Sequence, residues 1–349
     1  MISSLQIKSI AASLGFDACG IVRAGEAQNG LEDFKHWVGK GYHGTMKYLE
    51  DFESRARRFW ENFPAAKSII VVGVNYYSGT DSPSPLWGAG GGEGQNAANH
   101  PHPNPNPLPQ GGRGEGPRGH VARYAWGKDY HRVIGRRLEL LRDKLSEAAG
   151  RLVQAEICVD TKPLLERTLA ERAGLGFIGK QSQLLSPKFG PWLFLAELVT
   201  DLELEPDRPF VGDCGACRIC IDECPTQAIQ PEGGIDARRC IAYLTIEHKG
   251  EIAPELRPLI GDWVFGCDLC LQVCPYASKG KETRWTELKA ESGFGPALDL
   301  AELAKISSNR AYEKRFEGTA LTRANRKQLL RNAAIVRENL NALENTRER

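Results

Sequence analysis

The sequence predicts a mixed α/β domain, then a cysteine-rich domain, then a helical C-terminal region. Short apolar runs alternate with helical patterns up to residue 205, which is typical of α/β and α+β domains. Eight of the ten cysteines lie between residues 214 and 274, and residues 285–349 have a polar, helical pattern. We therefore expect domains at 1–205, 206–284 and 285–349.

Length and composition narrow the classes of function. A chain of 349 residues has room for two or three domains, and a net charge of +1 restricts any nucleic-acid surface to a local patch. No apolar run is long enough to span a bilayer, and the N-terminus lacks the apolar region of a signal peptide. We expect a cytoplasmic, monomeric protein without membrane contact, in which Cys19 and Cys158 are buried free thiols.

The spacing of the cysteines predicts two [4Fe–4S] clusters. The first run follows the C-x2-C-x2-C-x3-C-P pattern of bacterial ferredoxins, in which the fourth cysteine binds the other cluster. This rule assigns one cluster to Cys214, Cys217, Cys220 and Cys274. It assigns the other to Cys224, Cys240, Cys267 and Cys270. Structural zinc would not explain the two C-x3-C-P endings, and disulfides suit small secreted domains. The 26 residues between Cys240 and Cys267 are an insertion relative to a compact ferredoxin.

The elements of residues 1–80 follow from hydrophobic patterning. Ile2, Leu5, Ile10 and Leu14 form a helical stripe. We expect strands at 16–22 and 68–77 and a helix at 31–38. The three arginines within 54–58 are equally compatible with a solvated face and with an anion or amide clamp.

Residues 81–118 are rich in proline and glycine and predict a disordered insertion. A helix at 132–149 and a strand at 153–159 follow. Asp160 stands at the carboxyl end of that strand, and Pro163 suits the first turn of the next helix. Asp160 is thus either a helix cap or an acid or base directed into a crevice, where ligands of α/β sheets collect.

The segment 174–179 matches G-x-G-x-x-G, but it follows a helix rather than a strand. We therefore reject a dinucleotide site and expect a helix stop with close backbone approach. An apolar strand is expected at 193–200. Residues 305–349 contain eleven Lys or Arg against five Glu, an excess of six positive charges. This excess is either a solvated face or a surface that contacts phosphates.

Several motifs together resemble the epoxyqueuosine reductase family. The segments 124–131, 159–167 and 173–180 and the cysteine pattern carry the resemblance, which covers nearly the whole chain except 81–118. It implies a cobalamin-binding α/β domain, a ferredoxin-like domain and HEAT-like C-terminal helices. It also implies reduction of epoxyqueuosine to queuosine and water at the wobble position of tRNA anticodons.

The resemblance also implies roles for individual residues. Asp160 matches the proton donor, and we expect burial beside the corrin to raise its pKa. The positions matching the cobalamin pocket are Arg55, Arg57, Tyr124, His131, Asp160, Leu184, Leu195 and Asp268. His248 in the insertion, and Arg323, Arg326 and Lys327 in the basic region, are candidates for tRNA contact.

Two other classes of function share some of these features. A cobalamin-dependent reductive dehalogenase would share both cofactors, but it usually has an export signal and would not need a basic tail. A ferredoxin-type electron-transfer protein would leave the α/β domain without a purpose. For the enzyme, an external donor of the flavodoxin or ferredoxin type must supply the electrons.

Overall fold

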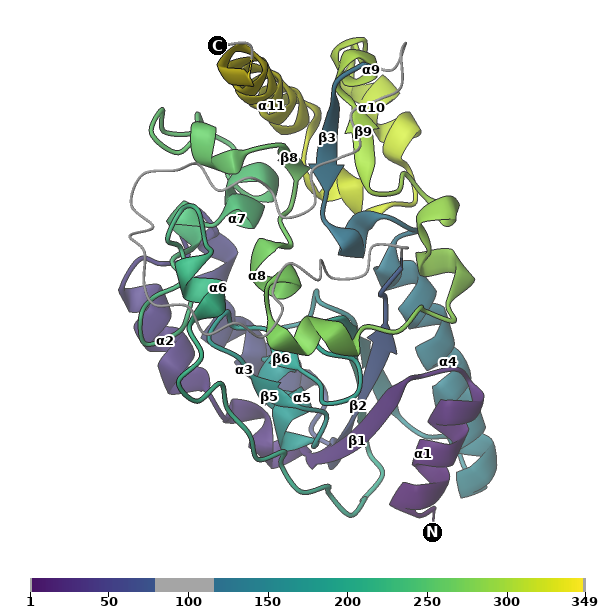
Figure 1. Cartoon of the computed structure of the whole chain (residues 1–349). Helices are drawn as coiled ribbons and strands as arrows, with labels where there is room; N and C mark the ends of the chain where they lie inside the picture. Colours follow the sequence, from purple (N-terminus) through teal and green to yellow (C-terminus); the bar gives the residue numbers. More distant parts are fainter. Residues whose placement is uncertain (1, 79–115, 348–349) are drawn as a thin grey trace.

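The computed structural model describes residues 2–78 and 116–347 (Figure 1). Most of the predicted insertion at 81–118 lies outside these residues, while Arg118 already belongs to a strand. None of the described helices is long and apolar enough to cross a membrane.

The α/β domain is built on a four-stranded antiparallel sheet with the order β1-β2-β7-β4. The strand β2 is buried along its whole length, which explains its continuous apolar sequence. The predicted strands are confirmed: β7 has the predicted bounds, β2 and β4 are shorter than predicted, and β1 begins two residues later and ends one residue later. The bounds are β1 Ala18–Arg23, β2 Ser68–Asn75, β4 Ala155–Cys158 and β7 Leu193–Thr200.

Helices cover both faces of this sheet. Ile70, Val72 and Val74 of β2 pack with α1 and α4, while Ile69 and Val71 pack on the opposite side with α3 and α5. This alternation is the two-residue period of a strand buried on both faces. The helices are α1 Ser4–Ser13, α2 Leu31–Gly39, α3 Phe52–Asn62, α4 Tyr130–Ala149 and α5 Glu166–Arg172.

Two expectations about these helices were wrong. In α1 the buried residues are Ile7 and Ala11, whereas Leu5 of the expected stripe is 78% exposed. The helix α5 begins at Glu166 rather than near Pro163, because residues 161–164 form tight turns with bonds from Thr161 N to Val159 O and Leu164 N to Lys162 O. Asp160 therefore does not cap this helix.

The glycine-rich segment after α5 has the structure expected for a helix stop. Gly174 adopts φ +79° just beyond the helix, a conformation that glycine accepts readily. A Cβ on Gly176 would lie 2.3 Å from the carbonyl oxygen of Leu185, so the backbones approach closely there. The short strands β5 Phe177–Ile178 and β6 Leu184–Leu185 form a hairpin around this contact.

A second sheet joins the three predicted domains. Its order is β8-β3-β9, with β3 Arg118–Val121 parallel to β8 Trp263–Phe265 and antiparallel to β9 Ala297–Asp299. Each predicted domain contributes one strand, and the three strands lie side by side in Figure 1. The domain boundaries stay a prediction, but the backbone hydrogen bonds of this sheet connect all three predicted domains.

The remaining helices surround this sheet and the cysteine segment. Asn332 is fully buried in α11, and its side chain donates to the carbonyl oxygens of Thr245 and Val264. These bonds connect α11 to the insertion between the cluster cysteines. The helices are α6 Ile219–Asp222, α7 Ile241–Ile246, α8 Leu269–Gln272, α9 Leu300–Ala304, α10 Asn309–Phe316 and α11 Arg326–Arg347.

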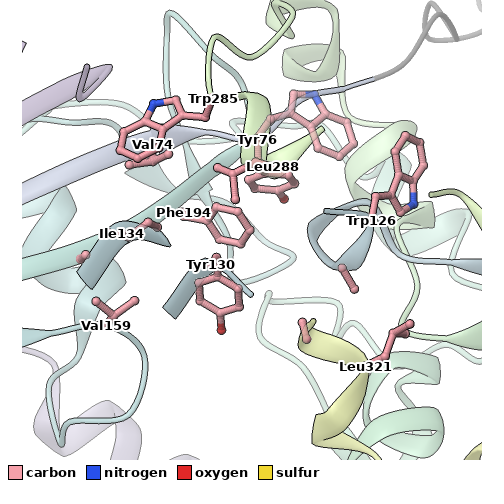
Figure 2. Packing of buried hydrophobic residues seen from close by; sticks show 14 of the residues in the cluster. Val74, Tyr76, Trp126, Tyr130, Ile134, Val159, Phe194, Trp285, Leu288 and Leu321 are labelled. Carbon is pink, nitrogen blue, oxygen red and sulfur yellow. The ribbon is translucent and has the colours of Figure 1, made fainter. Parts of the chain in front are cut away.

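An aromatic core connects the central sheet to the start of α4. Tyr130 stacks on Phe194 of β7 with the ring centroids 4.4 Å apart and the planes 8° from parallel. Phe194 also contacts Tyr76, at 4.4 Å between centroids (Figure 2). This packing fixes the first residues of α4 beside the carboxyl end of β4, where the candidate site lies.

Candidate active site

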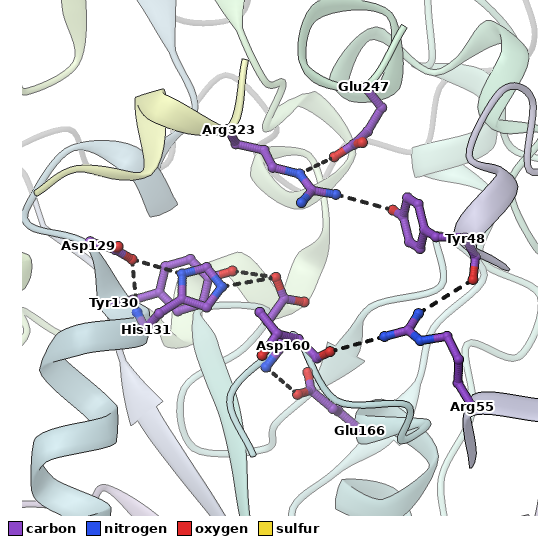
Figure 3. A network of polar contacts seen from close by, with 10 residues as sticks. Tyr48, Arg55, Asp129, Tyr130, His131, Asp160, Glu166, Glu247 and Arg323 are labelled. Carbon is purple, nitrogen blue, oxygen red and sulfur yellow. Dashed lines mark hydrogen bonds and ion pairs between the residues drawn. The ribbon is translucent and has the colours of Figure 1, made fainter. Parts of the chain in front are cut away.

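Asp160 follows β4 and has its carboxylate held by the first turn of α4. Tyr130 Oη donates to Asp160 Oδ2 at 2.7 Å, and His131 Nε2 lies 3.4 Å from the same oxygen (Figure 3). The backbone of Asp160 has φ +58°, in the left-handed region that non-glycine residues seldom adopt. Its side chain is nevertheless 59% exposed. Uncommon backbone geometry combined with an accessible carboxylate is typical of functional positions.

His131 lies between two carboxylates. Its Nδ1 is 2.8 Å from Asp129 Oδ1, and its Nε2 faces Asp160. Asp129 is also the N-cap of α4, since its side chain accepts the backbone N–H of His131. Although burial opposes it, the bonds to Asp129 and Asp160 raise the pKa of His131 to about 9. The imidazole is therefore protonated at neutral pH.

In the protein alone the pKa of Asp160 is lowered rather than raised, and the expected effect of burial beside the corrin stays a prediction. Burial acts to raise the pKa of Asp160, but the bonds from His131 and Tyr130 outweigh it and lower the pKa below its usual value. Asp160 is thus a carboxylate beside a protonated histidine, and the proton of the pair resides on His131.

Four residues from other parts of the chain lie around Asp160. Arg323 Nε donates to Glu247 at 2.7 Å, and its guanidinium lies 5.7 Å from the ring centroid of Tyr48. Figure 3 shows this group and Asp160 directed toward a common space. Arg55 closes one side, with bonds to the carbonyl oxygens of Tyr48 at 3.4 Å and Thr161 at 3.3 Å.

Charge–charge interactions divide the cluster cysteines into two sets of neighbours, although among the described residues no three of them lie close enough together to hold a metal ion. Electrostatic interactions link Cys274 to Cys214, Cys217 and Cys220. A second set of interactions links Cys240, Cys267 and Cys270 with one another and connects Cys224 to Cys240 and Cys270. Cys220 and Cys270 also interact, so the two groups adjoin.

One hydrogen bond and one aromatic contact connect the second cysteine group to the surroundings of Asp160. Asp268, next to Cys267, is buried and accepts the backbone N–H of Arg123 at 2.6 Å. The following residue, Tyr124, lies edge-on to Tyr130 with the centroids 6.3 Å apart. The segment around Cys267 is therefore connected, through residues 123 and 124, to Tyr130, which bonds to the Asp160 carboxylate.

Comparisons with known proteins identify the family of the chain. The family model described as epoxyqueuosine reductase QueG, DUF1730, matches residues 57–161, and the model of a 4Fe-4S double cluster binding domain matches 213–277. Epoxyqueuosine reductase of Xanthomonas campestris is 34% identical, covering 95% of this chain and 86% of the relative. The Pseudomonas aeruginosa relative is 36% identical, with coverages of 94% and 83%.

The chain belongs to the epoxyqueuosine reductase family. It is accordingly an oxidoreductase with two [4Fe–4S] clusters that reduces epoxyqueuosine in tRNA, and neither alternative class is favoured.

Solved structures of this family share the fold. A crystal structure of epoxyqueuosine reductase with an epoxyqueuosine-modified tRNA-Tyr stem loop matches with a TM-score of 0.77 and 30% identity, covering 96% of this chain and 80% of that chain. A Bacillus subtilis structure, with its catalytic aspartate loop swung out of the active site, matches equally well, with coverages of 96% and 81%.

The structure brings some of the predicted residues together and separates others. Asp160, His131, Arg55 and Tyr124 surround one region. Leu184 and Leu195 pack in the apolar cluster beneath it, whereas Arg57 is an exposed residue of α3. These assignments stay predictions.

The predicted tRNA contacts occupy different settings. Arg323 faces the candidate site, Arg326 Nε donates to the carbonyl oxygen of Ile306, and Lys327 is exposed. His248 Nε2 lies 2.9 Å from the carbonyl oxygen of Glu251, at the junction of the insertion with α11.

Sequence reasoning missed Asp129, Tyr130, Tyr48 and Glu247. Asp129 and Tyr130 stand next to His131 in the quoted motif, so their proximity was a usable signal. Tyr48 and Glu247 are 199 positions apart in the sequence, and only the fold brings both to Arg323.

Proposed function

We propose that the epoxide of epoxyqueuosine is reduced beside Asp160 and that Asp160 delivers a proton to the departing oxygen. The observation that carries this proposal is the setting of the Asp160 carboxylate, which is exposed toward Arg323 yet bonded to Tyr130 and adjacent to protonated His131. A group that transfers a proton must reach the substrate and be coupled to a proton source, and Asp160 meets both conditions.

The overall reaction removes the epoxide oxygen as water and leaves a carbon–carbon double bond. It consumes two electrons and two protons. With Asp160 ionised and His131 protonated, the pair holds one transferable proton, which passes from His131 Nε2 through Asp160 to the departing oxygen. The second proton that the reaction consumes comes from solvent. Asp129 stabilises the imidazolium through its contact with Nδ1, so His131 stays protonated before it transfers a proton to Asp160.

The residues around the site fit cobalamin. A corrin ring is broad and apolar, with amide groups along its edge. Leu193 and Leu195 share one face of β7 and remain half-buried, beside buried Leu184, so they offer an apolar surface. Arg55, Tyr124, His131 and Asp268 are the polar residues proposed to hold the edge. When bound, cobalamin supplies the strong reductant that cleavage of a C–O bond requires.

The cysteine groups support the assignment of cluster ligands. We propose that Cys214, Cys217, Cys220 and Cys274 bind the first cluster and that Cys224, Cys240, Cys267 and Cys270 bind the second. The second group adjoins Asp268, so electrons would enter at the first cluster and leave from the second toward the site. An external flavodoxin- or ferredoxin-type donor would supply them.

The substrate is a tRNA anticodon, so the site must open onto a surface that accepts RNA. Arg323 and His248 would face the tRNA near the modified base, while Arg326 and Lys327 begin α11 in the basic C-terminal region. We also propose that α10 and α11 are HEAT-like helices and that the protein is a cytoplasmic monomer.

Anaerobic reconstitution tests this function directly. The protein is loaded with iron, sulfide and cobalamin, reduced, and incubated with tRNA carrying epoxyqueuosine. The account predicts tRNA lighter by one oxygen atom at the modified nucleoside. Release of halide from an organohalide, without any change in the tRNA, would instead support the dehalogenase alternative.

A further inference from the structure

Glu166 holds the backbone of Asp160. The backbone nitrogen of Asp160 donates to Glu166 Oε1 at 2.6 Å, across six positions of the chain (Figure 3). Glu166 is the first residue of α5, a helix anchored in the apolar cluster by Leu169 and Ala170. The bond therefore ties a residue with an unfavourable backbone conformation to a fixed element.

This bond bears on the conformation that presents the carboxylate. Asp160 has φ +58°, and such geometry in a residue with a Cβ persists only where surrounding contacts enforce it. Thr161 donates to the carbonyl oxygen of Val159, and Arg55 donates to the carbonyl oxygen of Thr161, so both neighbours of Asp160 are also held. Glu166 supplies the contact to Asp160 itself.

The electrostatics explain how a second carboxyl group tolerates this position. Burial, and then the negative charge of Asp160, raise the pKa of Glu166 to about 8, while the hydrogen bond from the Asp160 backbone N–H, then Arg167 and His131, oppose the rise. At neutral pH Glu166 is mainly the neutral acid, whose carbonyl oxygen still accepts the Asp160 N–H. The bond thus exists without placing two adjacent negative charges beneath the site.

We infer that Glu166 is a positioning residue for the reaction, which acts by keeping the Asp160 carboxylate between Tyr130 and His131. This inference rests on the proposed role of Asp160. Without the bond, the segment 159–162 relaxes from its uncommon geometry and the carboxylate moves away from its proton source. A displacement of a reacting group by about 1 Å can lower a rate about 10²-fold.

The same helix provides a matched control. Glu171 of α5 accepts the backbone N–H of Ile178 at 2.9 Å, so it makes the same kind of bond on the same helix. Its partner Ile178 belongs to the β5–β6 hairpin, not to the Asp160 segment. Loss of this bond tests what a merely structural carboxyl contact contributes.

The experiment is a double-mutant cycle on reconstituted full-length enzyme with saturating tRNA. We expect Glu166→Ala to lower kcat about 10-fold or more with unchanged cluster and cobalamin spectra and little change in KM. Glu166→Gln keeps an acceptor for the N–H and should restore most of the loss. Glu171→Ala should leave kcat near the wild-type value. In an Asp160→Asn background, Glu166→Ala should cause no further loss, because Glu166 acts only through Asp160.

Each outcome separates the claims. Wild-type kcat in Glu166→Ala, or equal losses in the wild-type and Asp160→Asn backgrounds, would overturn the positioning role. Wild-type kcat in Asp160→Asn would overturn the proposed proton delivery instead. If Glu166→Ala does not fold, judged by circular dichroism and iron content, Glu166→Asp shortens the side chain while retaining the carboxyl. It should lower kcat where Glu166→Gln does not.

Discussion

His131 Nε2 lies 3.4 Å from the Asp160 carboxylate, and this contact couples a protonated imidazole to the carboxylate proposed to donate to the substrate. Because the pKa of His131 is raised to about 9, the proton is available throughout the neutral range. We therefore expect kcat to fall as the pH rises through about 9. This charged pair contributes its full stability below the ordinary histidine pKa of 6.5, and that contribution is lost as the pH rises through about 9.

Asp129→Asn should move that alkaline limb to lower pH. Asparagine still caps α4, but it removes the negative charge that favours the imidazolium, so the pKa of His131 falls. The measurement is kcat against pH for wild type and variant. Asp143→Asn, at an exposed residue of α4 paired with Arg142, is the control and should leave the limb in place. Superimposable profiles for Asp129→Asn and wild type would show that His131 is not the titrating group.

Cys240→Ala should remove only the second cluster. Anaerobic protein should contain about eight irons, since each of two cubanes holds four, and the variant about four. Cys158→Ala, at a buried thiol in the α/β domain, is the control and should retain the wild-type iron content. Iron analysis and cluster spectra provide the readout. Unchanged iron in Cys240→Ala would contradict the assignment.

Lys327 and Arg326 should differ in their effects on tRNA binding. Lys327 is exposed, so Lys327→Ala should reduce the slope of log affinity against log salt by about 0.7–0.9, the value for one phosphate contact. Arg326 is half-buried and its Nε bonds to the carbonyl oxygen of Ile306, so Arg326→Ala should also lower the melting temperature. Salt titrations of tRNA affinity and thermal melts separate the two. An unchanged slope in Lys327→Ala would place the RNA elsewhere.

The buried carboxyl group of Glu197 should make the free energy of unfolding decrease as the pH rises. This residue of β7 is fully buried, and neither carboxyl oxygen has a hydrogen-bond partner within the part of the chain that the structure describes. Burial, followed by the charges of Glu166 and Asp160, raises its pKa well above the usual value. The folded state then keeps a proton that the unfolded chain releases above its ordinary pKa of 4.5, so folding is progressively disfavoured as the pH rises beyond that value.

Glu197→Gln should therefore raise the free energy of unfolding at neutral pH and flatten its dependence on pH. Denaturant unfolding of the apoprotein at several pH values measures this effect. Glu203→Gln is the control, because Glu203 is an exposed glutamate beyond the end of β7. A Glu197→Gln variant with the wild-type pH dependence would show that Glu197 is ionised in the folded protein.

The sequence predicted best what depends on local pattern. The strand at 193–200 is mostly apolar and was predicted with the observed bounds, and the glycine segment was correctly interpreted as a helix stop. The start of α5 was misplaced because proline tolerance in a first turn does not require a helix there. The pairing of β3 with β8 could not be predicted from local pattern, because the two strands are far apart in the chain.

The candidate site shows the same division. Asp160 and His131 lie in recognisable motifs, but the lowered pKa of Asp160 depends on Tyr130 and His131 side chains that only the fold orients. The contact of Arg323 with Glu247 joins segments 76 positions apart, so Arg323 was expected among the phosphate contacts rather than at the site.

Asp160 is proposed to supply the proton that allows the epoxide oxygen to leave. The most direct test is a single-turnover reaction of fully reconstituted, reduced enzyme with tRNA carrying epoxyqueuosine, with the nucleoside products followed by mass. Asp160→Asn preserves the shape of the side chain but cannot donate as an acid, so the account predicts normal cluster and cobalamin spectra, normal tRNA binding and a rate lower by about 10²-fold or more. Formation of queuosine by Asp160→Asn at the wild-type rate would contradict the claim.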